Sequence, residues 1–128
     1  MVALSKETSP VYLLDDDPSI LKATRRLLDS VGWKVEAFSD PIAFLEHAAI
    51  HCPELAVIDM VMPDMNGLEV QTRLRRLSPS TRVIVLTAKD DPSVRRIAMN
   101  AGASAFFIKG VESGEFLAGL KAAADSVN

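Results

Sequence analysis

The rest of the chain is organised around the stretch Leu-Ala-Val-Ile-Asp-Met-Val-Met-Pro-Asp-Met-Asn-Gly, residues 55–67. Its apolar start, Leu55 to Ile58, predicts a strand buried on both faces, which ends abruptly at the carboxylate of Asp59. A turn is expected next, because Pro63 fixes a φ angle and Asn66-Gly67 tolerates positive φ. Ligands bind at the carboxyl ends of strands in open α/β sheets, so Asp59 is a candidate functional residue. Taken alone, it could equally be a loop carboxylate or a helix cap.

Four further apolar runs predict the remaining strands, at residues 11–14, 33–38, 83–86 and 105–108. Apolar residues at helical spacing predict a helix after each strand. Three helices open on an Asp-Pro pair, in which aspartate caps the helix and proline takes its first position; the pairs are 17–18, 40–41 and 91–92. The helix from Pro92 is expected to bury Val94, Ile97, Ala98 and Ala101. The last helix is predicted from Ser113 to Val127.

Strands that alternate with helices indicate a parallel sheet covered by helices on both faces. We therefore expect an α/β fold of the doubly wound, flavodoxin-like kind, with a five-stranded parallel sheet and five helices. The strand order 2-1-3-4-5 is the common choice for this pattern, although periodicity alone does not determine it. Residues 1–10 are predicted to be a loosely ordered lead, and residues 11–128 to form one domain.

The composition is that of an ordinary globular domain of 128 residues, 48% hydrophobic and 24% charged. A net charge of -3 argues against direct binding of nucleic acid, which needs a basic face. The single cysteine, Cys52, excludes an internal disulfide and is interpreted as an inert thiol. Arg73, Arg75 and Arg76 are interpreted as a solvated helix face rather than a phosphate-binding patch. No apolar run approaches the roughly 20 residues that cross a bilayer, so we expect a cytoplasmic protein.

Polar side chains end four of the predicted strands: Asp15 and Asp16, Asp59, Thr87 and Lys109. Three carboxylates at one edge repel one another unless a cation neutralises them, and hard oxygen ligands suit Mg²⁺. A metal ion, a lysine and a hydroxyl together are suited to holding a phosphoryl group and stabilising its transfer. Asp59 is placed to be the acceptor, because a carboxylate can attack phosphorus to form an acyl phosphate.

Four stretches together resemble the receiver domain of two-component response regulators, in the superfamily of the chemotaxis regulator. They are Leu-Leu-Asp-Asp-Asp-Pro (13–18), Val-Ile-Asp-Met-Val-Met-Pro-Asp-Met-Asn-Gly (57–67), Ile-Val-Leu-Thr-Ala (84–88) and Phe-Phe-Ile-Lys (106–109). Each stretch alone is a weak signal, whereas all four in this order and at these spacings are specific. The resemblance covers essentially the whole chain.

The resemblance implies that Asp59 accepts a phosphoryl group from a phosphohistidine on a sensor histidine kinase or a phosphotransfer protein. Asp16 and Asp59 would hold Mg²⁺ with the backbone carbonyl of Val61, and Asp15 would bind the ion through water. The chain would then be a signalling switch rather than an enzyme, although it would assist its own phosphorylation and dephosphorylation.

The resemblance also implies how the switch works. Thr87 would hydrogen-bond the phosphoryl oxygens and Lys109 would pair with them. On phosphorylation the Thr87 position would move and the aromatic ring of Phe106 would swing inward. These movements would change the surface formed by the fourth helix, fifth strand and fifth helix, through which the phosphorylated chain would form a homodimer.

One position departs from the family pattern, and others are close in sequence to the residues that match it. Gly110 stands where the family usually has proline, often after a cis bond, so the loop is expected to be looser here. Val61 and Lys89 would tune how long the phosphate lasts. Asp17 is interpreted as a helix cap and Asp64 as a turn residue, rather than as metal ligands.

Three alternative functions can be compared with this one. Asp15-x-Asp17 also fits the nucleophile motif of haloacid-dehalogenase-type phosphatases, which would make Asp15 the nucleophile but leaves residues 55–67 unexplained. A flavin-binding module of the same fold fails, because it needs hydroxyl and glycine residues after the first strand to cradle a phosphate, whereas three aspartates follow that strand here. The third alternative is a receiver that no longer takes phosphate and serves only for docking, which Gly110 keeps open.

Overall fold

The computed structural model describes residues 9–62, 65–88, 90–110 and 113–125, in which strands and helices alternate. The strands are β1 (Val11–Leu14), β2 (Val35–Phe38), β3 (Leu55–Ile58), β4 (Arg82–Thr87) and β5 (Ala105–Ile108). The helices are α2 (Pro18–Ser30), α3 (Pro41–His51), α4 (Gly67–Leu77), α5 (Pro92–Asn100) and α6 (Ser113–Asp125). No helix within these ranges is both long enough and apolar enough to cross a membrane.

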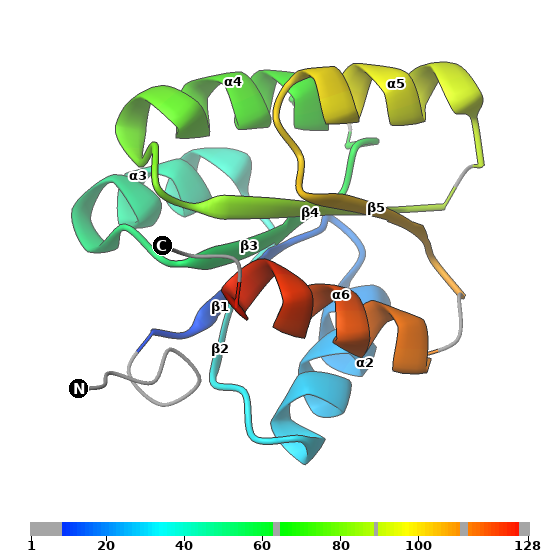
Figure 1. The fold of residues 1–128 in the computed structure, drawn as a ribbon. Coiled ribbons are helices and arrows are strands. Elements are labelled where there is room, and N and C mark those ends of the chain that lie inside the picture. Colours follow the sequence, from blue (N-terminus) through cyan, green and yellow to red (C-terminus); the bar gives the residue numbers. More distant parts are fainter. Residues whose placement is uncertain (1–8, 63–64, 89, 111–112, 126–128) are drawn as a thin grey trace.

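The strands form one parallel sheet in the order β2-β1-β3-β4-β5, as Figure 1 shows. This is the predicted order. Because the strands are parallel, their carboxyl ends meet at one edge of the sheet. The chain therefore brings the residues that follow β1, β3, β4 and β5 to the same side of the molecule.

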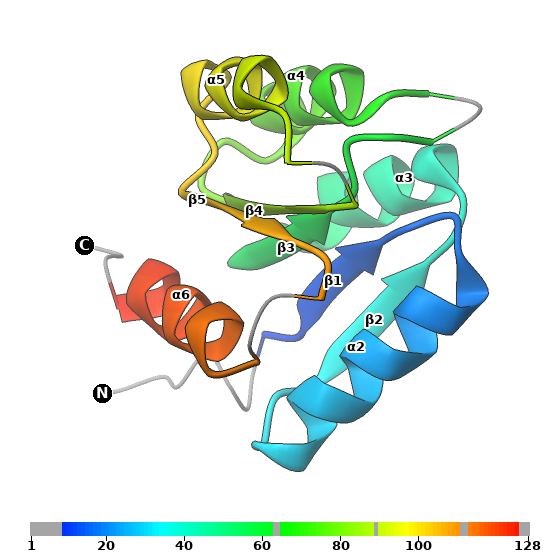
Figure 2. The ribbon, with the colours of Figure 1, turned by 90° about the vertical axis from the view of Figure 1, so that its right-hand side faces the viewer.

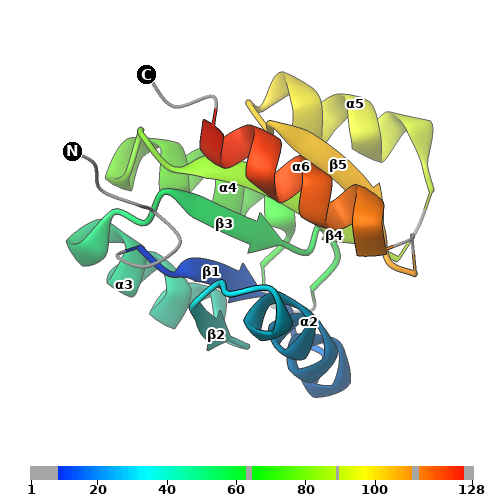
Figure 3. The same cartoon turned by 60° about the horizontal axis from the view of Figure 1, so that its bottom comes forward.

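Helices cover both faces of the sheet (Figure 2): α3, α4 and α5 lie on one face, and α2 and α6 on the other. Figure 3 shows α2 and α6 side by side in front of the strands. Successive side chains of a strand point to opposite faces. Accordingly, Tyr12 and Leu14 belong to the core under α3, α4 and α5, whereas Val11 and Leu13 belong to the core under α2 and α6.

The three predicted Asp-Pro helix starts are confirmed. Asp17, Asp40 and Asp91 are the N-caps of α2, α3 and α5, and the side chain of each accepts a backbone N–H of the first turn. The arginines of α4 are exposed, as predicted, and Arg73 pairs with Glu69 at 2.8 Å.

Two details of the predicted elements are wrong. The second strand begins at Val35 rather than at residue 33. The N–H of Trp33 donates to the carbonyl of Leu28 near the end of α2, at 3.0 Å, so residue 33 is still hydrogen-bonded to the end of the helix. The predicted inner stripe of α5 includes Ile97, which is 44% exposed. Only Ala98 of this helix is buried, because α5 packs closely on β5 and a small side chain suits that contact.

Candidate functional site

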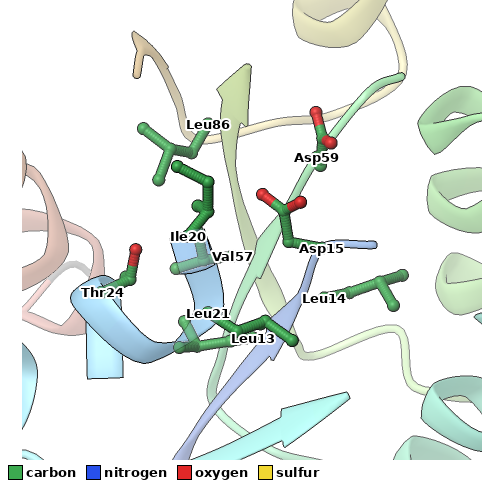
Figure 4. A pocket seen from close by; sticks show the side chains of 9 residues that line it. All are labelled: Leu13, Leu14, Asp15, Ile20, Leu21, Thr24, Val57, Asp59 and Leu86. Carbon is green, nitrogen blue, oxygen red and sulfur yellow. The ribbon is translucent and has the colours of Figure 1, made fainter. Parts of the chain in front are cut away.

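The register of β1 and β3 places two aspartates side by side. Leu14 pairs with Ile58, and the N–H of Asp59 donates to the carbonyl of Leu14 at 3.0 Å. The next residue of each strand, Asp15 and Asp59, therefore lies at the carboxyl edge. Both are buried, at 5% and 4% exposure. Figure 4 shows their carboxylates at the ends of β1 and β3, above apolar side chains of the strands and of α2.

Asp16 completes an acidic cluster with Asp15 and Asp59. Oxygen atoms of the three carboxylates lie within 4.8 Å of one another, and Asp16 is exposed to solvent. Oxygen ligands with an open, hydrated side are what Mg²⁺ requires, since this ion keeps several waters. The donor set therefore fits a hard divalent cation.

Lys109 supplies the positive charge of the site. Its backbone N–H donates to the carbonyl of Thr87 at 2.7 Å, which holds the residue beyond β5 against the end of β4. Its Nζ lies 2.7 Å from Asp15 Oδ2 and 3.2 Å from Asp59 Oδ2. The lysine thus bridges the two buried carboxylates.

Burial governs the protonation of these groups. Burial raises the pKa of Asp59, and the charge of Asp15 adds to this, while the Val61 N–H and Lys109 oppose it. Burial alone would lower the pKa of Lys109, but its hydrogen bond to Asp15 and the charges of Asp59 and Asp15 outweigh it, so the pKa is raised. Lys109 therefore stays charged, and Asp59 is a carboxylate held in an unfavourable environment.

Thr87 lies at the end of β4 and is inaccessible to solvent, at 0% exposure. Among the residues that the structure describes, its hydroxyl has no hydrogen-bond partner. A buried hydroxyl without a partner costs free energy, so this one is available to a ligand that enters the site.

The connection from β3 to α4 approaches the site closely. The N–H of Val61 donates to Asp59 Oδ1 at 3.2 Å, and the Val61 side chain is 59% exposed. Asn66-Gly67 does not use the positive φ that these residues tolerate: Asn66 has φ -75° and caps α4 by accepting the N–H of Glu69. Gly67 is needed for another reason, since a Cβ there would lie 2.6 Å from the carbonyl oxygen of Asp59. Pro63 and Asp64 lie outside the described residues.

Phe106 of β5 is already buried, at 6% exposure. The guanidinium of Arg95, from α5, lies over its ring at 4.9 Å from the centroid. Sequence reasoning missed Arg95, because an exposed helical arginine carries no signal for the ring it covers. Gly110 follows Lys109 with φ 91°, and no peptide bond between described residues is cis. Lys89 lies outside the described residues.

Comparisons with known proteins agree with this architecture. The model of the response regulator receiver domain matches residues 11–121. The response regulator protein TodT of Pseudomonas putida is 34% identical over 120 residues, which cover 94% of this chain and 53% of TodT. The transcriptional regulatory protein KdpE of Mycobacterium tuberculosis is 39% identical over 113 residues, which cover 88% of this chain and 50% of KdpE.

The solved structures agree as well. A CheY-like receiver domain protein from Methanospirillum hungatei superposes with a TM-score of 0.85 at 28% identity, over 91% of this chain and 94% of that one. The chain spans about half the length of the curated relatives it matches.

Proposed function

Since the chain belongs to the response regulator receiver family of two-component systems, we propose that it is a phosphorylation-dependent switch whose acceptor is Asp59. The observation that carries the proposal is the placement of Lys109, whose ammonium lies within 3.2 Å of both buried carboxylates. A cation in this position can pair with a phosphoryl group attached to Asp59. Family membership also sets aside the phosphatase and flavin-binding alternatives.

In the proposed reaction, an Oδ atom of Asp59 attacks the phosphorus of a phosphohistidine. The P–N bond breaks, the histidine leaves with the bonding electron pair, and an aspartyl phosphate remains. The donor would be a sensor histidine kinase or a phosphotransfer protein. Lys109 would move from Asp59 Oδ2 to the phosphoryl oxygens, and the hydroxyl of Thr87, which has no partner among the described residues, would donate to them.

Asp15, Asp16 and Asp59 would hold Mg²⁺, with the backbone carbonyl of Val61 as a further ligand. When bound, the ion neutralises negative charge that accumulates as the phosphoryl group approaches. Asp15 and Asp16 also have a role of their own, because their fixed positions at the end of β1 keep the ion beside Asp59 rather than in solvent.

The output would arise on the face formed by α5, β5 and α6. A hydrogen bond from Thr87 to the phosphoryl group would draw the end of β4 inward and would favour the buried position that Phe106, on the neighbouring strand, already occupies. In the phosphorylated state the chain would form a homodimer on this face, through α5 and α6.

The test is intact mass after incubation with acetyl phosphate, with and without Mg²⁺. We expect one phosphoryl adduct that requires Mg²⁺ and that is lost in Asp59→Asn. Asp17→Asn is the matched control, since Asp17 is exposed and asparagine can keep its capping bond to Ser19. This control should form the adduct as the parent does.

Two results would contradict the proposal. If the adduct persisted in Asp59→Asn but vanished in Asp15→Asn, the nucleophile would be Asp15. If the parent formed no adduct with either acetyl phosphate or a phosphorylated histidine donor, the chain would be a docking module.

A further inference from the structure

The ring of Phe106 and the hydroxyl of Thr87 lie on the same face of the sheet. Val85 of β4 is the register partner of Phe106 in β5, and the side chains of register partners in a parallel pair point to one face. Both belong to the core under α3, α4 and α5. Thr87 stands two residues after Val85 in the same strand, so its side chain points to this face too. The position of the ring therefore bears on the face of β4 that carries the Thr87 hydroxyl.

Arg95 of α5 covers this ring from the solvent side. Its guanidinium carbon lies 4.9 Å from the centroid of the Phe106 ring, and the residue itself is exposed. A guanidinium within about 6 Å of a ring centroid is attracted to the negative face of the aromatic system. Arg95 stands three residues before Ala98, the buried residue of α5, and residues at this spacing share one helix face. The face of α5 that enters the core therefore also presents Arg95 to the ring.

The carboxyl end of α5 is held by α4, which lies beside it (Figures 1 and 2). Gln71 Nε2 donates to the carbonyl of Ala98 at 3.2 Å, and Arg75 donates to the carbonyl of Ala101, the C-cap of α5, at 3.3 Å. These two hydrogen bonds fix α5 without using Arg95. A substitution at Arg95 should therefore remove the guanidinium from the ring without releasing the helix.

We propose that Arg95 is a positioning residue, which holds the ring of Phe106 in its buried position and thereby favours phosphorylation of Asp59. The family resemblance implies that this ring swings inward on phosphorylation, and the ring is already buried here, at 6% exposure. A phosphoryl group that favours the inward ring attaches more readily to a chain in which the ring is already inward. This consequence for phosphorylation rests on the proposed function, whereas the contact between Arg95 and the ring does not.

The first test follows the exposure of the ring. The chain is labelled with meta-fluorophenylalanine, and the fluorine resonance of Phe106 is assigned by its loss in Phe106→Leu. The shift of this resonance between light and heavy water reports how far the ring is exposed to solvent. We expect a larger solvent shift in Arg95→Gln than in the parent. An unchanged solvent shift in Arg95→Gln would overturn the proposal.

Arg96→Gln is the matched control, because Arg96 is the next residue of the same helix and is also exposed. Arginine and glutamine have similar helix propensities, so both substitutions affect the helix itself equally and only slightly. The solvent shift of the Phe106 resonance should be the same in Arg96→Gln as in the parent. If it grew as much as in Arg95→Gln, the effect would come from the charge of the helix rather than from the contact with the ring, and the proposal would fail.

A double-mutant cycle in urea tests whether Arg95 acts through the ring. Arg95→Gln should lower the equilibrium constant for folding by about twofold to fivefold, as loss of an exposed cation–π contact does. In the Phe106→Leu background the same substitution should have little effect, because no aromatic face remains. An equal effect in both backgrounds would overturn the proposal.

The last measurement concerns phosphorylation, which the first two do not require. With acetyl phosphate and Mg²⁺, Arg95→Gln should form the phosphoryl adduct more slowly than the parent, by up to about fivefold, whereas Arg96→Gln should match the parent. A parental rate in Arg95→Gln would overturn the proposed effect on phosphorylation. A parent chain that formed no adduct would instead contradict the proposed function, and the ring exposure and the double-mutant cycle would still decide whether Arg95 holds Phe106.

Discussion

At the scale of single residues, Asp59 is destabilising in the absence of a ligand. It is buried beside Asp15, and its pKa is raised chiefly by that burial. The folded state therefore holds the proton of Asp59 more tightly than the unfolded state, in which the pKa is about 4. Stability falls as the pH rises from about 4 through the folded pKa, and above that range the ionised carboxylate carries its full cost.

Asp59→Asn should consequently stabilise the fold at pH 7 without divalent ions, by on the order of 1 kcal/mol. Asparagine keeps the shape of the side chain but cannot ionise. The difference in free energy of unfolding between variant and parent should shrink as the pH is lowered through the folded pKa. Urea unfolding at several pH values measures this. A variant less stable than the parent at pH 7 would refute the prediction.

Gly67 shows how closely the backbone packs behind Asp59. A Cβ on this residue would lie 2.6 Å from both the carbonyl oxygen of Asp59 and the Cα of Met60. Both are backbone atoms, so neither can rotate away. Gly119 differs, because its Cβ would meet the far end of the Phe107 ring at 2.5 Å, and a small rotation of that side chain about χ1 moves the end of the ring away.

We therefore expect Gly67→Ala to cost about 1–3 kcal/mol, as overpacking does. Gly119→Ala should cost less, since alanine in a helix gains about 1 kcal/mol over glycine. Thermal unfolding of the two variants makes the comparison. Equal losses of stability in both variants would show that the turn after β3 can shift to accommodate a Cβ more easily than this geometry implies.

At the scale of elements, the Asp-Pro pairs determine where three helices begin. The side chain of Asp40, for example, accepts a hydrogen bond from the N–H of Ala43 at 3.1 Å. Pro41, in the first turn, has no N–H and therefore leaves no donor unsatisfied. Such local chemistry is visible in the sequence, which is why these starts were predicted correctly.

Asp40→Ala should lower the free energy of unfolding by about 1 kcal/mol through loss of the cap of α3. Asp40→Asn retains a side-chain oxygen and should lose much less. The midpoints of urea unfolding distinguish the two. If the asparagine variant lost as much as the alanine variant, charge rather than the capping bond would be responsible.

The sequence could not predict which helical side chains are buried, because this depends on contacts between elements. Apolar spacing placed Ile97 in the core, but only the packing of α5 on β5 shows that this residue faces outward. Similarly, Gln71 of α4 is 1% exposed, and its Nε2 donates to the carbonyl of Ala98 in α5 at 3.2 Å. A glutamine in a helix predicts a surface position, and only the neighbouring helix makes it a buried one.

The candidate site was easier to predict than these contacts. Asp15, Asp59, Thr87 and Lys109 each end an apolar run, and the strand order alone brings them to one edge. The distances from Lys109 Nζ to the two carboxylates required the three-dimensional structure, as did the finding that the Thr87 hydroxyl has no hydrogen-bond partner within the described part of the chain.

At the scale of the whole molecule, the central sheet joins two separate apolar cores. Leu28 of α2 is buried in one and Leu74 of α4 in the other. The strands contribute alternate residues to both cores. One core therefore cannot unfold while the other stays folded.

Leu28→Ala and Leu74→Ala should therefore each cost about 2–5 kcal/mol and shift one and the same cooperative transition. Near-UV and far-UV circular dichroism followed during urea unfolding should give coincident curves for both variants. Separate transitions in either variant would mean that the two faces unfold independently.

The position of β1 has a consequence for synthesis of the chain. This strand lies inside the sheet and pairs with β2 on one side and with β3, more than forty residues later, on the other. While the chain emerges from the ribosome, β1 and β2 can pair first, but the second edge of β1 stays open until β3 has been made. During that interval the nascent chain exposes the unpaired edge of an apolar strand, where another strand could pair with it.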